Sequence, residues 1–187
     1  AQKARKKVVT KSAAGVAYLM KKNKIDVHSG FGSLKSPTEV VVEGADGSKT
    51  LKAKNIILAT GSVPRHLPFL KVDGKHVVSS DEILELKTPP ASLIVLGAGA
   101  VGMEFASIYS RFGTKCTVLE MLDRVLPLED REVSEEMAKC YKKRGIDVMT
   151  STKLESAEVK GGEVVCQLDT GAKKVELKAA LQEAMRY

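Results

Sequence analysis

The residues best suited to chemistry form one short run, Gly97-Ala98-Gly99-Ala100-Val101-Gly102, which has the GxGxxG spacing of a phosphate-binding loop. The first glycine would permit a tight turn, the second would let the backbone approach a pyrophosphate, and the third would let a helix pack close to a strand. An apolar strand is expected directly before the run and a helix directly after it, so the free N–H groups at the start of that helix would face the phosphates. The run therefore predicts a dinucleotide site.

A carboxylate follows where such a site would contact the sugar. Glu120 ends the next expected strand, well after Gly102. It could accept hydrogen bonds from both hydroxyls of the adenine ribose and would repel a 2′-phosphate, which favours NAD over NADP. Arg124 weakens this distinction, because an arginine near the site can bind a 2′-phosphate. The alternative interpretation of Glu120 is a surface glutamate at a strand end.

Glu104 is a second acidic candidate, two residues after Gly102 on the expected helix. A charge so near a nucleotide is either solvated or placed against the reacting ring. The sequence by itself does not separate these two interpretations.

The elements that must position these residues alternate in type. Apolar runs bounded by turn signals predict strands, and apolar residues at helical spacing predict helices. The expected order is strand Ser92–Leu96, helix Val101–Phe112, strand Lys115–Leu119, helix Glu129–Arg144 and strand Ile146–Met149. This order predicts an α/β fold with a doubly wound parallel sheet of Rossmann type. An antiparallel hairpin or meander is expected after it, from strands at 154–159, 163–168 and 175–177.

The N-terminal third of the sequence shows a different pattern. A helix is expected up to Lys24, followed by a short strand at Ile25–Val27, and Asp46-Gly47 is a strong hairpin signal. The apolar run Asn55–Ala59 is typical of a strand buried on both faces. The irregular, proline-containing segment after it predicts a boundary. The expected division is therefore a partial domain at residues 1–68, a nucleotide-binding domain at 69–178, and a tail at 179–187 that is helical in character.

Charge and cysteine usage narrow the possible partners. The net charge is +7, but eight of the 30 basic residues precede the first acid, Asp26, and the rest of the chain is close to neutral. The basic segment is interpreted as the solvated face of an amphipathic helix, with an arm that binds phosphate or a partner as the alternative. Apart from Tyr18, no aromatic residue lies between its lysines, so nucleic-acid binding is not expected. The scattered cysteines and histidines predict neither a metal site nor a disulfide framework, and no run is long and apolar enough to span a membrane.

Three groups of residues, the first of which contains the glycine-rich run, together form the signature of a protein family. They are Gly97 to Glu104 with Val118-Leu119-Glu120 and Asp123-Arg124-Val125-Leu126-Pro127, then Ala59-Thr60-Gly61-Ser62-Val63-Pro64, and then Gly30-Phe31-Gly32. Over about residues 1–178 the chain resembles the dihydrolipoamide dehydrogenase family of flavin-dependent pyridine nucleotide-disulfide oxidoreductases. The resemblance implies that Gly97 to Gly102, Glu120 and Leu154 hold NAD. It also implies that residues 1–68 form the C-terminal part of an FAD-binding domain, in which Gly32, Thr60, Gly61 and Ser62 contact FAD. Glu104 would be a catalytic residue at the nicotinamide-flavin contact.

The same resemblance implies a parent enzyme that oxidises dihydrolipoamide and passes electrons through FAD to NAD. Such an enzyme would be a homodimer of the bacterial cytoplasm or the mitochondrial matrix, and its partner would be the lipoyl domain of a 2-oxo acid dehydrogenase complex. The family's CxxxxC pair is not in this sequence, and the tail replaces an expected strand after Leu177. We therefore expect no activity from this chain by itself, a parallel sheet that is one strand short, and an N-terminal segment without the first strands of its sheet. The alternatives are a non-catalytic NAD-binding module and another flavoprotein disulfide reductase of the mercuric or glutathione type.

Overall fold

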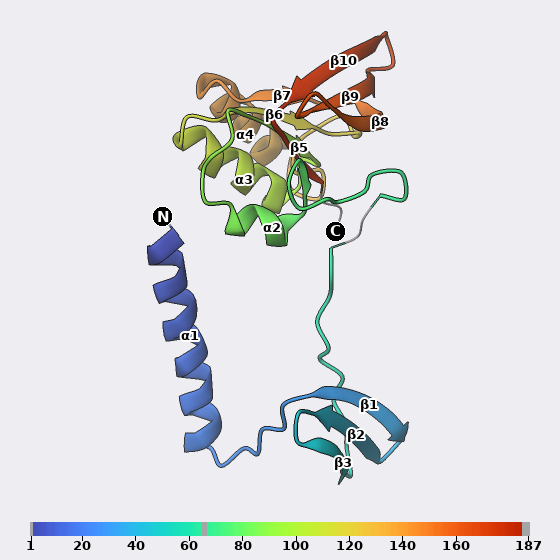
Figure 1. Ribbon diagram of the computed structural model, residues 1–187. Coiled ribbons are helices and arrows are strands. Elements are labelled where there is room, and N and C mark those ends of the chain that lie inside the picture. The colour runs from blue at the N-terminus through green and yellow to red at the C-terminus, as the bar shows by residue number, and fades with distance from the viewer. Residues whose placement is uncertain (1, 65–66, 185–187) are drawn as a thin grey trace. The chain divides into compact units, whose positions relative to one another are not determined.

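The computed structural model describes residues 2–64 and 67–184, and residues 182–184 by their backbone only. The chain divides into two compact units, residues 1–62 and residues 63–187 (Figure 1). Each unit has its own sheets, so the fold of each follows from its own sequence.

The first unit contains one helix and a small antiparallel sheet. Its elements are α1 (Gln2–Lys22), β1 (Phe31–Ser36), β2 (Glu39–Gly44) and β3 (Gly47–Lys52). The hairpin expected from Asp46-Gly47 is confirmed, because β2 and β3 pair around the two turn residues Ala45 and Asp46, and Gly47, the first residue of β3, has a φ of +105°. The helix expected up to Lys24 is confirmed as α1, and none of its described residues is buried.

The predictions of two strands in this unit are wrong. Residues 55–59 and Ile25–Val27 have no regular secondary structure, and the Ile57 side chain is 90% exposed. A strand needs a neighbouring strand to pair its N–H and C=O groups. No described strand pairs with either segment, so neither joins a sheet.

The second unit is built on a five-stranded parallel sheet in the order β4-β11-β5-β6-β7. Its strands are β4 (Val77–Val78), β5 (Ser92–Leu96), β6 (Lys115–Leu119), β7 (Asp147–Met149) and β11 (Leu181–Ala184). The predicted parallel α/β sheet is confirmed, and the predicted bounds of β5 and β6 agree with the observed ones. Strands β5, β6 and β7 lie side by side in chain order, and β5 has a further neighbour on its other side.

That neighbour is β11, and it corrects the expectation of a helical tail. Leu181–Ala184 lies between β4 and β5 and pairs in parallel with both, so the sheet is not short of a strand. The amide of Ala180 donates to Ser92 Oγ at 2.9 Å and aligns the entry of the strand, and Leu181 is buried. A central position in a sheet satisfies backbone groups on both sides, which outweighs the weak helical preference of a short segment. Residues 185–187 of the expected tail lie outside the described residues.

Helices cover one face of the parallel sheet. They are α2 (Ser80–Glu85), α3 (Ala100–Arg111) and α4 (Arg131–Lys143). A capping box, in which Ser79 and Glu82 satisfy each other's backbone N–H groups, starts α2. Tyr109 of α3 donates to Ile83 O at 2.7 Å, and Tyr141 of α4 donates to Met103 O at 2.6 Å. These buried hydroxyl bonds fix α3, the helix that follows the glycine-rich run, to both of its neighbours.

An antiparallel meander covers the other face, as expected from the sequence (Figure 1). It consists of β8 (Lys153–Lys160), β9 (Glu163–Asp169) and β10 (Lys174–Ala179), in the order β10-β9-β8. Successive side chains of β5 point to opposite faces of the sheet and so contribute to an apolar core on each face. Leu93 and Val95 pack against the helices, and Ile94 packs against the meander. The sheet is therefore buried on both faces, which explains its continuous apolar strands.

The three cysteines differ sharply in environment. Burial raises the pKa of Cys116 to about 11 and that of Cys166 to about 12, whereas Cys140 is exposed on α4. Because the thiolate is the reactive form, we expect dithionitrobenzoate to label one thiol per native chain quickly and the other two only after denaturation. Labelling a Cys140→Ser variant checks the assignment, since its native chain should show no fast thiol. Fast labelling of that variant would contradict the burial of the other two.

Candidate functional site

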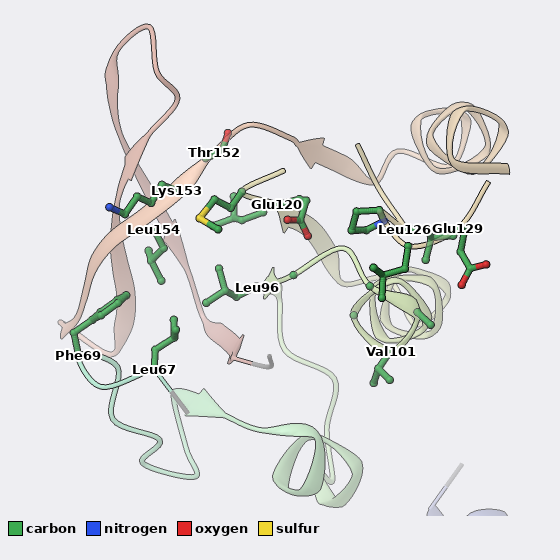
Figure 2. Close-up of a pocket in the computed structure, with 18 residues that line it drawn as sticks. Leu67, Phe69, Leu96, Val101, Glu120, Leu126, Glu129, Thr152, Lys153 and Leu154 are labelled. Atoms are coloured by element: carbon green, nitrogen blue, oxygen red, sulfur yellow. The ribbon is translucent and has the colours of Figure 1, made fainter. Parts of the chain in front are cut away.

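A pocket of about 610 Å³ opens at the carboxyl ends of β5 and β6. Four segments of the second unit supply most of its walls: Gly97 with residues 99–102, residues 119–121, residues 126–129, and residues 152–154. Leu96, at the end of β5, and Leu67 and Phe69, from the segment before β4, complete the lining (Figure 2). A pocket outside the carboxyl ends of parallel strands is the usual ligand site of a doubly wound sheet.

The glycine-rich run forms the floor of this pocket. Gly97 has a φ of +106°, and a Cβ atom at Gly102 would lie 2.1 Å from the Gly97 carbonyl oxygen, so the turn closes tightly against α3. A Cβ atom at Gly99, by contrast, would have no described heavy atom within 4 Å, so the space above this residue is open to a ligand. The geometry at Gly97 and Gly102 is that of the tight turn and the close helix packing that the spacing predicts, and the space at Gly99 is open as a pyrophosphate would require.

The start of α3 provides hydrogen-bond donors to this open space. Gly99 caps the helix without a side chain, and the first-turn amides of Ala100, Val101 and Gly102 find no acceptor within residues 2–64 and 67–184. Unpaired N–H groups and the positive end of the helix dipole attract anions. The geometry suits a phosphate or pyrophosphate.

Glu120 occupies a central position in the site. Its backbone continues β6, because its amide donates to Met149 O and its carbonyl accepts from Thr152, each at 2.8 Å. Its carboxylate accepts from the Ala98 amide at 2.8 Å through Oε2 and from the Leu122 amide at 2.9 Å through Oε1. Each oxygen keeps a further lone pair, so the carboxylate can still accept from the two hydroxyls of a ribose.

Arg124 is engaged away from such a sugar. Its Nη2 donates to Pro127 O at 2.7 Å and to Glu129 O at 3.4 Å. The guanidinium therefore holds together the loop that forms one wall of the pocket. One nitrogen of the guanidinium, Nη2, is thus bonded within this loop.

The structure separates the remaining predicted residues into three places. Leu154, 5% exposed, lines the pocket, and Figure 2 shows it on the opposite side of Glu120 from Leu126. Glu104 is exposed on α3 and is not among the residues that line the pocket. Gly32 lies on β1, and residues 60–62 lie in the irregular segment after β3, so these four belong to the first unit.

Sequence reasoning missed several residues of the pocket wall. Leu67 and Phe69 come from the irregular segment around the expected boundary, and no local pattern marks them as pocket residues. Leu126 belongs to the signature in the sequence, but only the structure shows its role: its amide donates to Ala98 O at 2.8 Å, and its φ is +46°. A left-handed backbone at a non-glycine residue beside a glycine-rich loop is a feature that only the three-dimensional structure reveals.

Within the described residues, no group of three His, Cys, Asp or Glu side chains could hold a metal ion. Among the described helices, none is long and apolar enough to cross a membrane.

Comparison with known proteins gives a consistent result. The family model for pyridine nucleotide-disulphide oxidoreductases matches residues 1–182. A dihydrolipoyl dehydrogenase of Bacillus subtilis is 46% identical over 162 residues, which are 82% of this chain and 34% of the relative. The mitochondrial dihydrolipoyl dehydrogenase of Schizosaccharomyces pombe is 40% identical over 169 residues, 89% of this chain and 33% of the relative. The chain thus spans about a third of the length of these curated relatives.

Solved structures show the same likeness. The flavoprotein disulfide reductase RclA of Escherichia coli, in its Cu(II) complex, matches with a TM-score of 0.74 at 26% identity, over 96% of this chain and 42% of that one. LpdA of Mycobacterium tuberculosis matches with a TM-score of 0.88 at 23% identity, over 98% of this chain and 41% of that one, and shows the fold.

Proposed function

Because the chain belongs to the pyridine nucleotide-disulphide oxidoreductase family, we propose that the pocket of its second unit binds NAD. Gly97 to Gly102 would hold the pyrophosphate, Glu120 the adenine ribose, and Leu154 would border the adenine. The observation that carries this proposal is the position of the Glu120 carboxylate beside the open helix start, with a free lone pair on each oxygen.

The same family uses FAD together with NAD. We propose that Gly32, Thr60, Gly61 and Ser62 contribute to FAD binding in the whole protein, and that Glu104 lies where nicotinamide and flavin meet. The exposure of Glu104 on α3 leaves it accessible to such a contact. The flavin, when bound, would supply the hydride and thiol-linked electron chemistry, which the protein positions.

For the whole protein we propose dihydrolipoyl dehydrogenase activity, in which dihydrolipoamide is oxidised and electrons pass through FAD to NAD. The identities of 40% and 46% to enzymes of that name support it. The proposed partner is the lipoyl domain of a 2-oxo acid dehydrogenase complex, and the proposed assembly is a homodimer. The relatives include bacterial and mitochondrial enzymes, and we propose the bacterial cytoplasm or the mitochondrial matrix as the compartment.

The 187-residue chain is expected to bind NAD without turning over dihydrolipoamide. Thiol-disulfide exchange needs a pair of reactive cysteines, and two of the three thiols here are buried with raised pKa values. NAD binding can therefore be measured in this chain without turnover of dihydrolipoamide.

The test is a fluorescence titration of the purified chain with NADH and with NADPH. We expect NADH to bind at least about tenfold more tightly, because the Glu120 carboxylate would face the 2′-phosphate of NADPH. Equal affinities, or a preference for NADPH, would overturn the assignment to NAD. With FAD and dihydrolipoamide added, we expect no reduction of NAD above the rate without protein.

A further inference from the structure

The contacts of Glu120 reach beyond the sugar that it is proposed to bind. Its carboxylate is joined to the glycine-rich run through the Ala98 amide, which is 22 residues away in sequence. Ala98 itself is fully buried, and its carbonyl accepts from the Leu126 amide at 2.8 Å. The middle of the glycine-rich run is thus held on both its N–H and its C=O by the segment that follows β6.

We propose that Glu120 is also a positioning residue, which holds the glycine-rich loop in its nucleotide-binding shape before any nucleotide is bound. The backbone of Glu120 is fixed by Met149 and Thr152, so its carboxylate reaches back from a rigid strand end. Glycines give the loop many alternative conformations. A fixed acceptor for the Ala98 amide selects one of them.

The geometry explains why the acceptor must be a carboxylate. Two backbone N–H groups, those of Ala98 and Leu122, converge on the same side chain, one on each oxygen. A carboxylate offers two acceptor oxygens, whereas the glutamine amide offers one acceptor and one donor. Glutamine at this position can therefore satisfy only one of the two amides, and its NH₂ group opposes the other.

This role goes further than the proposed function and predicts a different result from sugar recognition alone. A residue that only contacts the ribose hydroxyls would, when neutralised, lose NADH affinity and gain NADPH affinity. Neutralising a residue that also shapes the loop would lower NADH affinity without raising NADPH affinity, because both cofactors use the same pyrophosphate cradle and its loss offsets the removed repulsion. The expected change in cofactor affinity rests on the proposed binding of NAD at the pocket. The expected shape of the ligand-free loop does not.

The experiment is amide hydrogen exchange on the ligand-free chain, comparing the parent with Glu120→Gln, Glu120→Ala and the control Glu129→Gln. Glu129 also lines the pocket, so its variant removes one negative charge there without touching Ala98. In Glu120→Ala we expect the amides of Ala98 and Leu122 to exchange at least about tenfold faster, and in Glu120→Gln at least one of them. In Glu129→Gln both should exchange as in the parent, and amides at the centre of β6 should be unchanged in every variant.

Two results would overturn the proposal. One is unchanged exchange of Ala98 and Leu122 in both Glu120 variants. The other is equal acceleration of these amides and of those in β6, which would make Glu120 a contributor to global stability instead. Should Glu120→Ala fail to fold, the isosteric Glu120→Gln still decides.

Cofactor titrations of the same variants then test the consequence for binding. Glu120→Gln is expected to weaken NADH by about tenfold or more and to leave NADPH bound no more tightly than by the parent, because loss of the loop shape offsets the removed repulsion of the 2′-phosphate. A gain in NADPH affinity would overturn the positioning role. If the parent chain binds no NADH at all, the proposed function fails, while the exchange result still stands on its own.

Discussion

Replacing Gly102 by alanine is expected to lower the melting temperature of the second unit by roughly 10 °C or to prevent its folding, at a cost of about 3 kcal/mol or more. The added Cβ would lie 2.1 Å from the Gly97 carbonyl oxygen and 3.1 Å from Val95 Cγ1. The nearer atom belongs to the backbone of a turn at positive φ, so it cannot move aside as a flexible side chain can. Thermal unfolding followed by circular dichroism measures the effect.

Gly99→Ala is the matched control, because it adds the same methyl group at the preceding glycine of the motif, where space is open. Gly99 has a φ of −72°, which alanine adopts readily, and no described heavy atom lies within 4 Å of the new Cβ. We expect a melting temperature within a few degrees of the parent but NADH affinity at least about tenfold lower, since the methyl group would occupy the approach of the pyrophosphate. If Gly102→Ala melted like Gly99→Ala, the close packing of α3 on the turn would be refuted.

Deleting residues 181–187 is expected to abolish cooperative folding of the second unit. This deletion removes β11, leaving β4 and β5 without the strand that pairs with both. The milder variant Leu181→Ala should cost about 2–5 kcal/mol, because the side chain is 3% exposed in the core beneath the helices. Circular dichroism melts of both variants against the parent measure the loss.

Val133→Ala provides the comparison for this series. Its side chain on α4 is 50% exposed, so the same kind of truncation should change the melting temperature little. A deletion variant that melted at the parent temperature would show that β11 is not part of the folded sheet, and the helical expectation for the tail would return.

Local patterns were enough to predict the central part of the second unit. The apolar runs Ser92–Leu96 and Lys115–Leu119 are strands with the expected bounds, and Gly102 closes the turn as its spacing predicts. Spacing of this kind is reliable because the turn, the strand and the helix start each depend on residues that are neighbours in the sequence.

Other features depended on contacts between distant segments. Asn55–Ala59 has the composition of a buried strand, yet Ile57 is exposed because no described strand pairs with it. Leu181–Ala184 has the composition of a helix, yet it is a central strand because β4 and β5 leave a gap that its backbone fills. Propensity is a weak preference, and the availability of hydrogen-bonding neighbours decides between helix and strand.

The site shows the same division between sequence and structure. The sequence alone predicted that a glycine-rich loop and Glu120 form one dinucleotide site, because their types and spacing suit the chemistry of a phosphate and a ribose, and the structure brings both to one pocket. Only the tertiary structure decided that the Glu120 carboxylate accepts from the Ala98 amide and that Arg124 donates to Pro127 O. It also decided that Phe69 lines the pocket. Those contacts join segments that folding brings together, and their geometry depends on the whole sheet and not on any local pattern.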